Sequence, residues 1–374
     1  MNNKSWLILI LFIMPFVIGN AQDTIEIHEG LHLYPSLDIK FQIKADNDII
    51  FLGEQHGDKE SKIILKQLIL YMCNEYGLRD IAIEEDAAFS EHANDYINGK
   101  IDNLRTELTL RKDVLDTIKE LNEYYENSMF KVHLIDVDSP KSTIDEHLSN
   151  IADNNTLNEL NISGIGEEYV SIEKTFQLIE RLKNMELEED MRSELNSLED
   201  SLYLYQHLFV VTEEKVRIPN RVSQAPIKEA VITRNIASIK ESIGRKPLLV
   251  FSGGAHAMKS NQIVSINYVI PSAEQLTDLG YKVYSIFCCR LSGEYNWRGR
   301  KKEIEYDLEN IVFHNGITLK TILSEYEKYK LVQIDLNQPR NVGLDLLKLG
   351  FKPGKSHLVF DEIIFIDNAT PMEH

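Results

Sequence analysis

The 374-residue sequence predicts an α/β protein, a three-layer sandwich around a mostly parallel central sheet. Short apolar runs, typical of buried strands, alternate with helical segments between residues 48 and 138 and again after residue 227. Such alternation indicates crossover units and a parallel sheet. Two of the runs end in similar loops, GEQH at 53–56 and GGAH at 253–256. Since ligands bind outside the carboxyl ends of parallel strands, both loops predict one shared site.

The first 21 residues have the pattern of a secretory signal peptide. Lys4 gives a basic start, residues 6–18 form an apolar core, and Gly19-Asn20-Ala21 are small residues that a signal peptidase accepts. This core is too short for a membrane span, and no later segment approaches about 20 apolar residues. We therefore expect a secreted or periplasmic protein without a membrane span, in which residues 22–374 form a single α/β domain.

The composition argues against two classes of partner. The net charge of −19 makes nucleic acid and anionic membrane surfaces poor partners, which leaves a small-molecule or peptide substrate. Three cysteines do not make a disulfide framework. Cys288 and Cys289 are adjacent near a strand end, so we expect one buried and one exposed thiol. The oligomeric state is not predicted.

The first half of the domain follows a strand–helix rhythm. The helix that starts near residue 58 has Asp58 as its expected N-cap, and its apolar residues recur at helical spacing. Two of the strands end in acidic residues, Glu84-Glu85-Asp86 and Asp136-Val137-Asp138. The elements expected here are strand 49–52, helix 58–76, strand 81–83, a helical stretch through 108–121, and strand 131–135.

The second half interrupts the rhythm and then resumes it. Two helical stripes, at 169–182 and 195–208, predict a helical hairpin inserted at about 140–210 as a cap or lid. The tail is strand-like and is expected to extend the sheet at an edge. The remaining expected elements are helix 227–242 and strands 247–251, 281–287, 332–336 and 362–366.

The two loop histidines and a strand-ending glutamate are the first candidates for chemistry. His56, like His256, can act as a general base or as a metal ligand, or it can be a loop histidine bonded to backbone. Glu84 ends a strand and should rise at the same edge as His56, where a carboxylate orients an imidazole or completes a metal site. Alternatively, Glu84 is an acidic residue that only ends a strand.

Three further residues stay ambiguous from sequence. Asp136 and Asp138 point to the same side if their strand continues, so position alone does not separate them, and either can be a plain turn residue. Arg234 lies on the helix before the second GxxH loop. An arginine there can clamp an anionic group or stabilise an oxyanion, or it can be an ordinary surface residue.

Several familiar catalytic patterns are absent from the sequence. It contains no G-x-S-x-G nucleophile elbow, no Walker loop and no H-E-x-x-H helix. These absences count against standard serine hydrolases, nucleotide hydrolases and zincin proteases.

Taken together, these motifs resemble the superfamily that joins erythromycin esterases, ChaN-type haem-binding uptake proteins and Tiki/TraB proteins. Residues 53–57 are similar to the G-E-x-x-H-G segment of erythromycin esterases, and Glu84 and Asp138 match their strand-ending acids. Arg234-Asn235 followed by 253–256 resembles the Tiki/TraB arrangement of two GxxH motifs. The resemblance covers about residues 45–290 and the tail at 364–371.

The resemblance implies a site in which His56 is the base or metal ligand, with Glu84 and His256 beside it and Glu54 in the catalytic segment. Two positions depart from the relatives. Gly253 stands where erythromycin esterases have the first of two histidines, and Glu54 stands where Tiki-type proteins usually lack a glutamate.

Two functions from different classes follow. The first is an exported hydrolase of an ester or amide, in which His56 and Glu84 activate water directly or through a divalent metal, zinc or manganese, held by His56, Glu84 and His256. Arg234 would steady the developing negative charge. The alternative is a ChaN-like haem or iron-binding uptake protein without catalysis.

Overall fold

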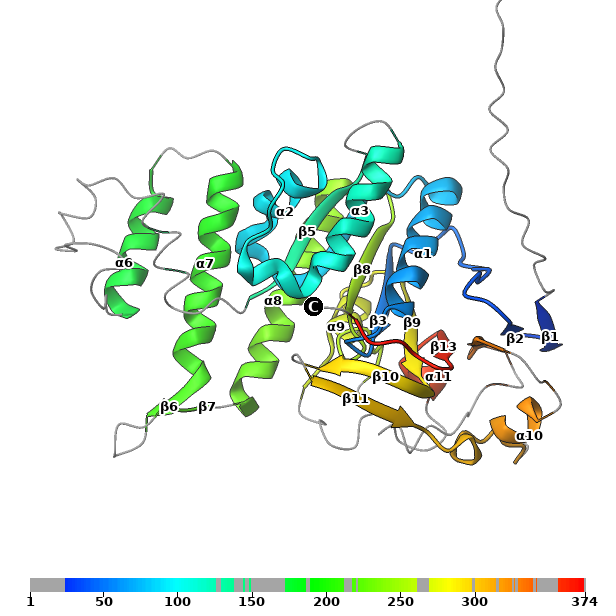
Figure 1. Cartoon of the computed structure of the whole chain (residues 1–374). Coiled ribbons are helices and arrows are strands. Elements are labelled where there is room, and N and C mark those ends of the chain that lie inside the picture. Colours follow the sequence, from blue (N-terminus) through cyan, green and yellow to red (C-terminus); the bar gives the residue numbers. More distant parts are fainter. Residues whose placement is uncertain are drawn as a thin grey trace, which may run out of the picture.

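A nine-stranded sheet forms the middle layer of the computed structural model, with helices on both of its faces (Figure 1). This arrangement confirms the predicted three-layer α/β class. The structure describes residues 24–125, 129–137, 144, 148, 172–185, 189–211, 217–219, 221–260, 269–297, 300–313, 316–324, 326, 329–338, 341 and 356–372. The expected signal peptide at 1–21 lies outside these ranges, as does Asp138. Within them, no helix is long and apolar enough to cross a membrane.

Six neighbouring strands of the sheet are parallel, and three at one side are antiparallel. The spatial order is β1-β2-β12-β13-β9-β3-β8-β4-β5, with the parallel block running from β13 to β5. Their bounds are β1 (Ile25–His28), β2 (Leu31–Tyr34), β3 (Ile49–Glu54), β4 (Asp80–Asp86), β5 (Lys131–Asp136), β8 (Leu248–Gly253), β9 (Val283–Arg290), β12 (Leu331–Asp335) and β13 (Glu362–Ile366).

Two sets of helices cover the two faces of the sheet. α1, α2 and α3 pack on one face, and α8, α9 and α10 pack on the other. The helices are α1 (Glu60–Tyr76), α2 (Ser90–Ile97), α3 (Lys112–Tyr124), α6 (Ile172–Lys183), α7 (Glu189–Leu208), α8 (Arg221–Ile243), α9 (Ser272–Asp278), α10 (Leu319–Leu323) and α11 (Ser356–Val359), with short 3₁₀ turns η1 (Ala87–Phe89), η2 (Thr106–Arg111) and η3 (Leu308–Asn310).

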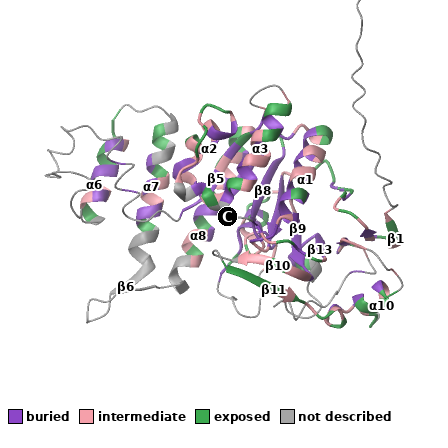
Figure 2. Cartoon of the chain, viewed as in Figure 1, coloured by how far each residue is buried: buried purple, intermediate pink, exposed green. Residues whose placement is uncertain are grey.

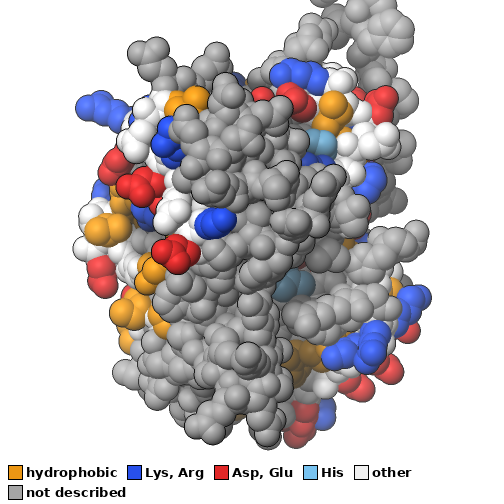
Figure 3. All heavy atoms as spheres, turned by 90° about the vertical axis from the view of Figure 1, so that its left-hand side faces the viewer, with side chains coloured by type: hydrophobic (Ala, Val, Ile, Leu, Met, Phe, Trp, Pro, Cys, Tyr) orange, Lys and Arg blue, Asp and Glu red, His pale blue; other side chains and the backbone are white. Residues whose placement is uncertain are grey.

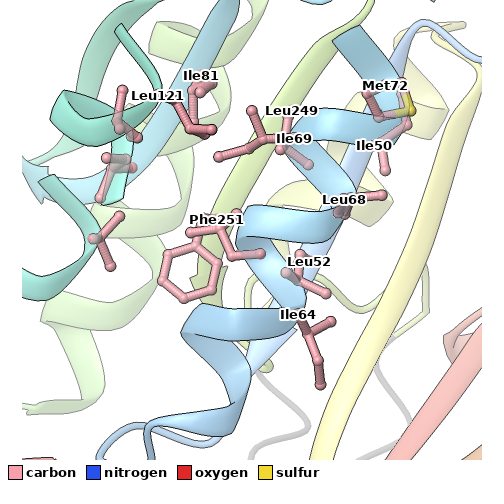
Figure 4. Close-up of a cluster of buried hydrophobic side chains, with 14 of the residues drawn as sticks. Ile50, Leu52, Ile64, Leu68, Ile69, Met72, Ile81, Leu121, Leu249 and Phe251 are labelled. Atoms are coloured by element: carbon pink, nitrogen blue, oxygen red, sulfur yellow. The ribbon is translucent and has the colours of Figure 1, made fainter. Parts of the chain in front are cut away.

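The apolar strand runs are continuous because both faces of the sheet are buried. In β3, Ile50 and Leu52 belong to the core under α1 and α3, whereas Ile49 and Phe51 belong to the core under α8 and α9. Figure 4 shows Leu52, Ile64 and Phe251 in the first of these cores. In Figure 2 the strands are buried along most of their length.

The same two-sided cover changes the expectation for the paired cysteines. Cys288 lies in one core and Cys289 in the other, so both thiols are buried and both are free. The expected exposed thiol is absent because helices cover both faces of β9.

The expected helical hairpin is present as α6 and α7, beside the β5 side of the sheet (Figure 1). Its leucines, with Ile144 and Leu148, form a separate small core that reaches the body through Ala88 of η1. α7 also packs against α8. The hairpin is therefore a lateral extension of the domain.

The tail strands β12 and β13 extend the sheet as expected, and the hairpin β1–β2 continues it to the edge. A second hairpin, β10 (Ser292–Trp297) and β11 (Arg300–Glu305), follows β9. It lies at the lower ends of the parallel strands in Figure 1. A short ribbon, β6 (Phe209–Val211) and β7 (Arg217–Pro219), links α7 to α8.

Candidate active site

The parallel register brings the two GxxH loops together at one edge of the sheet. Glu54, the last residue of β3, pairs with Gly253, the last residue of β8. On the other side of β8, Ile83 of β4 pairs with Phe251, so Glu84 emerges next to Gly253. The structure thus places the two loops and Glu84 on three adjacent strand ends.

Glycines permit the close approach of these loops. A Cβ atom on Gly253 would lie 3.0 Å from Nε2 of His56 and 3.3 Å from Oε2 of Glu84. A Cβ atom on Gly254 would lie 2.3 Å from the ring of Phe287. The first glycine therefore brings the His56 imidazole and the Glu84 carboxylate against the same Cα, and the second lets the loop pack on the core.

Glu54 is the buried anion on which His56 depends. Its side chain has no exposed surface, and its Oε1 lies 3.0 Å from Nδ1 of His56. The same oxygen accepts a hydrogen bond from Nη1 of Arg111 at 2.6 Å, and Oε2 accepts one from the ammonium of Lys62. Burial alone would raise the pKa of Glu54, but Lys62, His56 and Arg111 outweigh it and hold that pKa well below its usual range. Glu54 is therefore a permanent carboxylate.

Phe251 and the neighbouring carboxylates complete the surroundings of these cations. Lys62 Nζ lies 4.6 Å and Arg111 Cζ 5.8 Å from the centre of the Phe251 ring. Arg111 also lies near Oε2 of Glu84, at 3.8 Å, and near Oε1 of Glu85, at 3.3 Å. Burial alone would lower the pKa of Arg111, but the three glutamates outweigh this effect and raise it above its usual value.

His256 lies between two carboxylates. Its Nε2 is 3.1 Å from Oε1 of Glu84, and its Nδ1 is 2.7 Å from Oε1 of Glu229 on α8. The Glu229 oxygen lies off the direction of the Nδ1–H bond, so the contact between Glu229 and His256 is an ion pair and not an aligned hydrogen bond. Burial alone would lower the pKa of His256, but Glu84 and Glu229 outweigh it and raise that pKa well above its usual value. His256 is therefore an imidazolium.

Glu84 is the counter-ion of that imidazolium. Its Oε2 accepts a hydrogen bond from the backbone N–H of Gly253, and its Oε1 faces His256. Burial alone would raise the pKa of Glu84, but His256, His56 and Arg111 outweigh it and hold that pKa well below the usual range. Glu84 thus ties β4 to the second GxxH loop and stays ionised.

Two more acids lie behind this layer. Asp136, at the end of β5, forms an ion pair with Lys228 of α8 at 2.7 Å. Burial, assisted by Glu84, raises the pKa of Asp136 to about 6 despite Lys228. Burial also raises the pKa of Glu85 to about 7, against the effect of Arg111. Asp136 thus lies within the electrostatic reach of Glu84 but pairs with Lys228.

A cavity of about 510 Å³ opens over the two histidines. The β10–β11 hairpin and the end of β9 form its other wall, so residues more than 200 positions apart in the sequence face each other. The cavity is lined by Glu54, Gln55, His56, Gly253, Gly254, Ala255, His256, Met258, Phe287, Arg290, Tyr295, Lys302, Ile304 and Tyr306.

The structure does not bring Arg234 to this cavity. Its guanidinium is 55% exposed and forms an ion pair with Asp200 of α7. The expected clamp role therefore has no geometric basis at Arg234, because the residue lies on the side of α8 that faces α7. The arginines that do reach the site are Arg111 and Arg290. The expected site residues that the structure brings together are Glu54, His56, Glu84 and His256.

A divalent metal held by His56, Glu84 and His256 stays a prediction. Glu84 and Glu229 face the two nitrogens of His256. Among the described residues, no group of three or more His, Cys, Asp or Glu side chains is arranged to hold a metal ion. We therefore derive no step through a metal at His56, Glu84 and His256.

Four residues of the candidate site were not predicted from the sequence: Lys62, Arg111, Glu229 and Arg290. The first three have a common signal, since each is charged and lies on a buried helical stripe. Lys62 lines up with Leu65 and Ile69, Arg111 with Val114 and Ile118, and Glu229 with Ile232 and Ile236; all six apolar partners are buried. A charge on an apolar stripe requires a buried partner.

Three solved structures have similar architecture. A Bacillus cereus protein aligns with 87% of this chain and 90% of its own, with a TM-score of 0.62 and 17% identity. A succinoglycan biosynthesis protein aligns with 87% of this chain and 89% of its own, with a TM-score of 0.64 and 17% identity. The third is a histidine-to-asparagine mutant of the erythromycin esterase EreC in its open conformation. It aligns with 88% of this chain and 92% of its own, with a TM-score of 0.60 and 13% identity.

At such identities the similarity shows the fold alone. The chain has the fold found in an erythromycin esterase, as that part of the resemblance predicted. No family model and no curated protein matches the sequence. The ChaN and Tiki/TraB parts of the resemblance stay predictions.

Proposed function

We propose that this protein is an exported hydrolase in which His56 activates water for attack on an ester or amide bond. The observation that carries the proposal is the pair formed by His56 and the buried, permanently ionised Glu54 in the wall of the cavity. Export rests on the signal-peptide pattern of residues 1–21.

The Glu54–His56 pair has the geometry of an oriented general base. When Nδ1–H of His56 donates a hydrogen bond to Glu54, the neutral ring carries its lone pair on Nε2, the atom that faces Gly253. Nε2 takes a proton from water as the water attacks the substrate carbonyl. The resulting imidazolium is stabilised by Glu54, which Lys62 and Arg111 keep ionised.

His256 supplies the positive charge that we first expected from Arg234. It lines the same cavity as His56, and its two carboxylate partners keep it protonated. A fixed cation beside a carbonyl stabilises the oxyanion that develops during attack, because it is oriented before the reaction. In this proposal Glu84 positions His256 and does not touch substrate.

The structural neighbours support the reaction class. One of them is named an erythromycin esterase, and ester hydrolysis is what we take from that name. We do not extend the proposal to macrolides, because Gly253 stands where that family has a histidine. The proposed reaction uses His56 as the base and needs no metal.

The test is turnover of 4-nitrophenyl esters by the purified protein and by His56→Ala. We expect kcat to fall by about 10²- to 10⁴-fold, the usual contribution of a general base. Stability should change by less than about 1 kcal/mol, because the His56 side chain is 34% exposed. His32→Ala, on β2 four strands away from β3, is the matched control and should keep full activity.

Two further measurements sharpen this experiment. EDTA dialysis should leave turnover unchanged, whereas loss on dialysis and recovery with zinc or manganese would return the metal to the mechanism. A haem titration read by absorbance tests the alternative function: a Soret shift that His56→Ala abolishes, without esterase activity in the parent protein, would replace the hydrolase proposal.

A further inference from the structure

More cationic than anionic side chains line the cavity over His56 among the described residues, in a protein whose net charge is −19. The cationic ones are His256, Arg290 and Lys302. Glu54 is the only carboxylate among the described lining residues, and its oxygens are held by Lys62 and Arg111. Because Glu84 and Glu229 pair with His256, the cations that concern a ligand are Arg290 and Lys302.

Arg290 is a buried cation in the wall of the cavity. It ends β9 and is 5% exposed, and its Nη1 donates to the backbone oxygen of His56 at 2.9 Å. Nη1 also lies 3.4 Å from Oδ2 of Asp58, and the guanidinium stacks on Tyr295 with Cζ 4.0 Å from the ring centre. Within the described structure, its Nε is buried without a hydrogen-bond partner.

Lys302 faces the cavity from the β10–β11 hairpin, which forms the wall opposite the two histidine loops. It lies on β11 directly across from Tyr295 of β10, and both side chains line the cavity. Side chains alternate along a strand, so Lys301, Glu303 and Glu294 lie on the other face of the hairpin. Lys302 is exposed and forms no ion pair with any residue of the described ranges.

Lys and Arg side chains lie among Asp and Glu side chains at the lower right of the space-filling view (Figure 3). In β11 three such side chains, Arg300, Lys301 and Lys302, are consecutive and exposed. A cavity of one sign concentrates ligands of the opposite sign, and an acidic protein repels them elsewhere. The charge pattern therefore favours an anionic ligand over a neutral one.

We propose that Arg290, Tyr295 and Lys302 form an anion subsite: the substrate carries a carboxylate or phosphate group that binds here while its scissile bond lies at His56. The placement of the scissile bond at His56 rests on the proposed hydrolase function. The binding of an anion by the subsite depends only on the residues that line the cavity.

Binding is tested without turnover, in the His56→Ala protein. Isothermal titration with glutarate and with inorganic phosphate distinguishes the two anionic groups. In the His56→Ala background, we expect the Kd for the anion to rise about threefold with Lys302→Gln and about tenfold with Lys302→Glu. The Kd should also rise with increasing salt concentration. The matched control is Lys301→Gln, which removes the same charge from the other face of β11 and should bind like its parent. No binding of either anion, or equal loss in both lysine variants, overturns the subsite.

Turnover then links the subsite to the reaction. In the parent enzyme, the ratio of kcat/KM for mono-4-nitrophenyl glutarate to that for 4-nitrophenyl acetate should fall about threefold or more with Lys302→Gln and stay constant with Lys301→Gln. Anion binding without hydrolysis of either ester would reject the hydrolase and keep the subsite. Hydrolysis with an unchanged ratio would reject the subsite and keep the hydrolase.

Discussion

His256 shows how pairing outweighs burial at a single residue. A buried imidazole is normally neutral, since burial disfavours the charged form. Here Glu84 and Glu229 lie on opposite sides of the ring, and Glu229 is itself held by the N–H and the hydroxyl of Ser272 at 2.8 and 2.5 Å. The arrangement fixes a cation at the strand ends.

We predict that His256 stays doubly protonated at pH 8. Its pKa is raised in the folded state, so its contribution to stability is complete below the unfolded value of about 6.5 and is lost as pH rises through the folded value. Ring ¹⁵N NMR shifts should report two protonated nitrogens at pH 8. A ring with one unprotonated nitrogen at pH 8 would contradict the assignment, and His256→Gln identifies its signals.

The site residues that could be predicted from the sequence are those that follow a strand directly. Glu54, His56, Glu84 and His256 follow apolar strands directly, so strand order was enough to place them together. Arg234 was predicted at the site from its sequence position, but it lies off the buried stripe of Ile232 and Ile236 and turns to Asp200. The helical charges reach the site across the sheet, and only tertiary packing decides which of them do so.

At the scale of elements, a chain of polar side chains crosses four strands of the sheet. Tyr284 of β9 donates to Oε2 of Glu362 on β13 at 3.1 Å, and Gln333 of β12 donates to Oε1 at 2.7 Å. Tyr34 of β2 in turn donates to Gln333. Burial raises the pKa of Glu362 to about 7, so the acid is largely protonated in the fold below neutral pH.

Glu362→Gln should therefore alter how stability depends on pH. The unfolded carboxyl ionises near pH 4.5 and the folded one near 7, so the protein loses stability as pH rises between these values. The neutral amide removes this loss, on the order of 3 kcal/mol across that interval. Urea unfolding at pH 5 and pH 8 measures it, with the exposed Glu309→Gln as control. Parallel pH profiles for the parent and Glu362→Gln would contradict the prediction.

Elements with strong periodicity were predictable, and others were not. The strands buried on both faces were predicted to within about three residues, whereas α7 and α8 each begin six residues before the predicted start. The β10–β11 hairpin was missed because RKKEIE of β11 is almost wholly charged, and a strand exposed to solvent has no apolar pattern. This omission mattered, since the hairpin forms one wall of the cavity.

At the scale of the whole molecule, the tail holds the loop that carries His56. The N–H and hydroxyl of Thr370 donate to Glu60 at 2.8 and 2.6 Å, and Lys59 donates its N–H to the Thr370 carbonyl at 3.0 Å. Met372 donates its N–H to the carbonyl of Gly57 at 3.1 Å. The position of the base thus depends on residues more than 300 positions away.

Thr370→Val should cost more activity than stability. Losing one hydroxyl from a buried carboxylate lowers the free energy of unfolding by about 1 to 2 kcal/mol. A looser loop should also lower kcat about tenfold, because small displacements of a base are costly. Thr277→Val, which removes a similar hydroxyl contact on α9, should affect stability only. Equal kcat in the two variants, measured on the same ester, would show that the tail does not position His56.

The strand order also constrains when the protein can finish folding. β2 pairs only with β1 and β12, and β12 reaches the parallel block only through β13. The hairpin β1–β2 can therefore join the sheet only after β12 and β13 (residues 362–366) have been synthesised. A chain that is still being synthesised exposes the unpaired edge of β9 until then, so we expect this protein to need protection by a holding chaperone during synthesis.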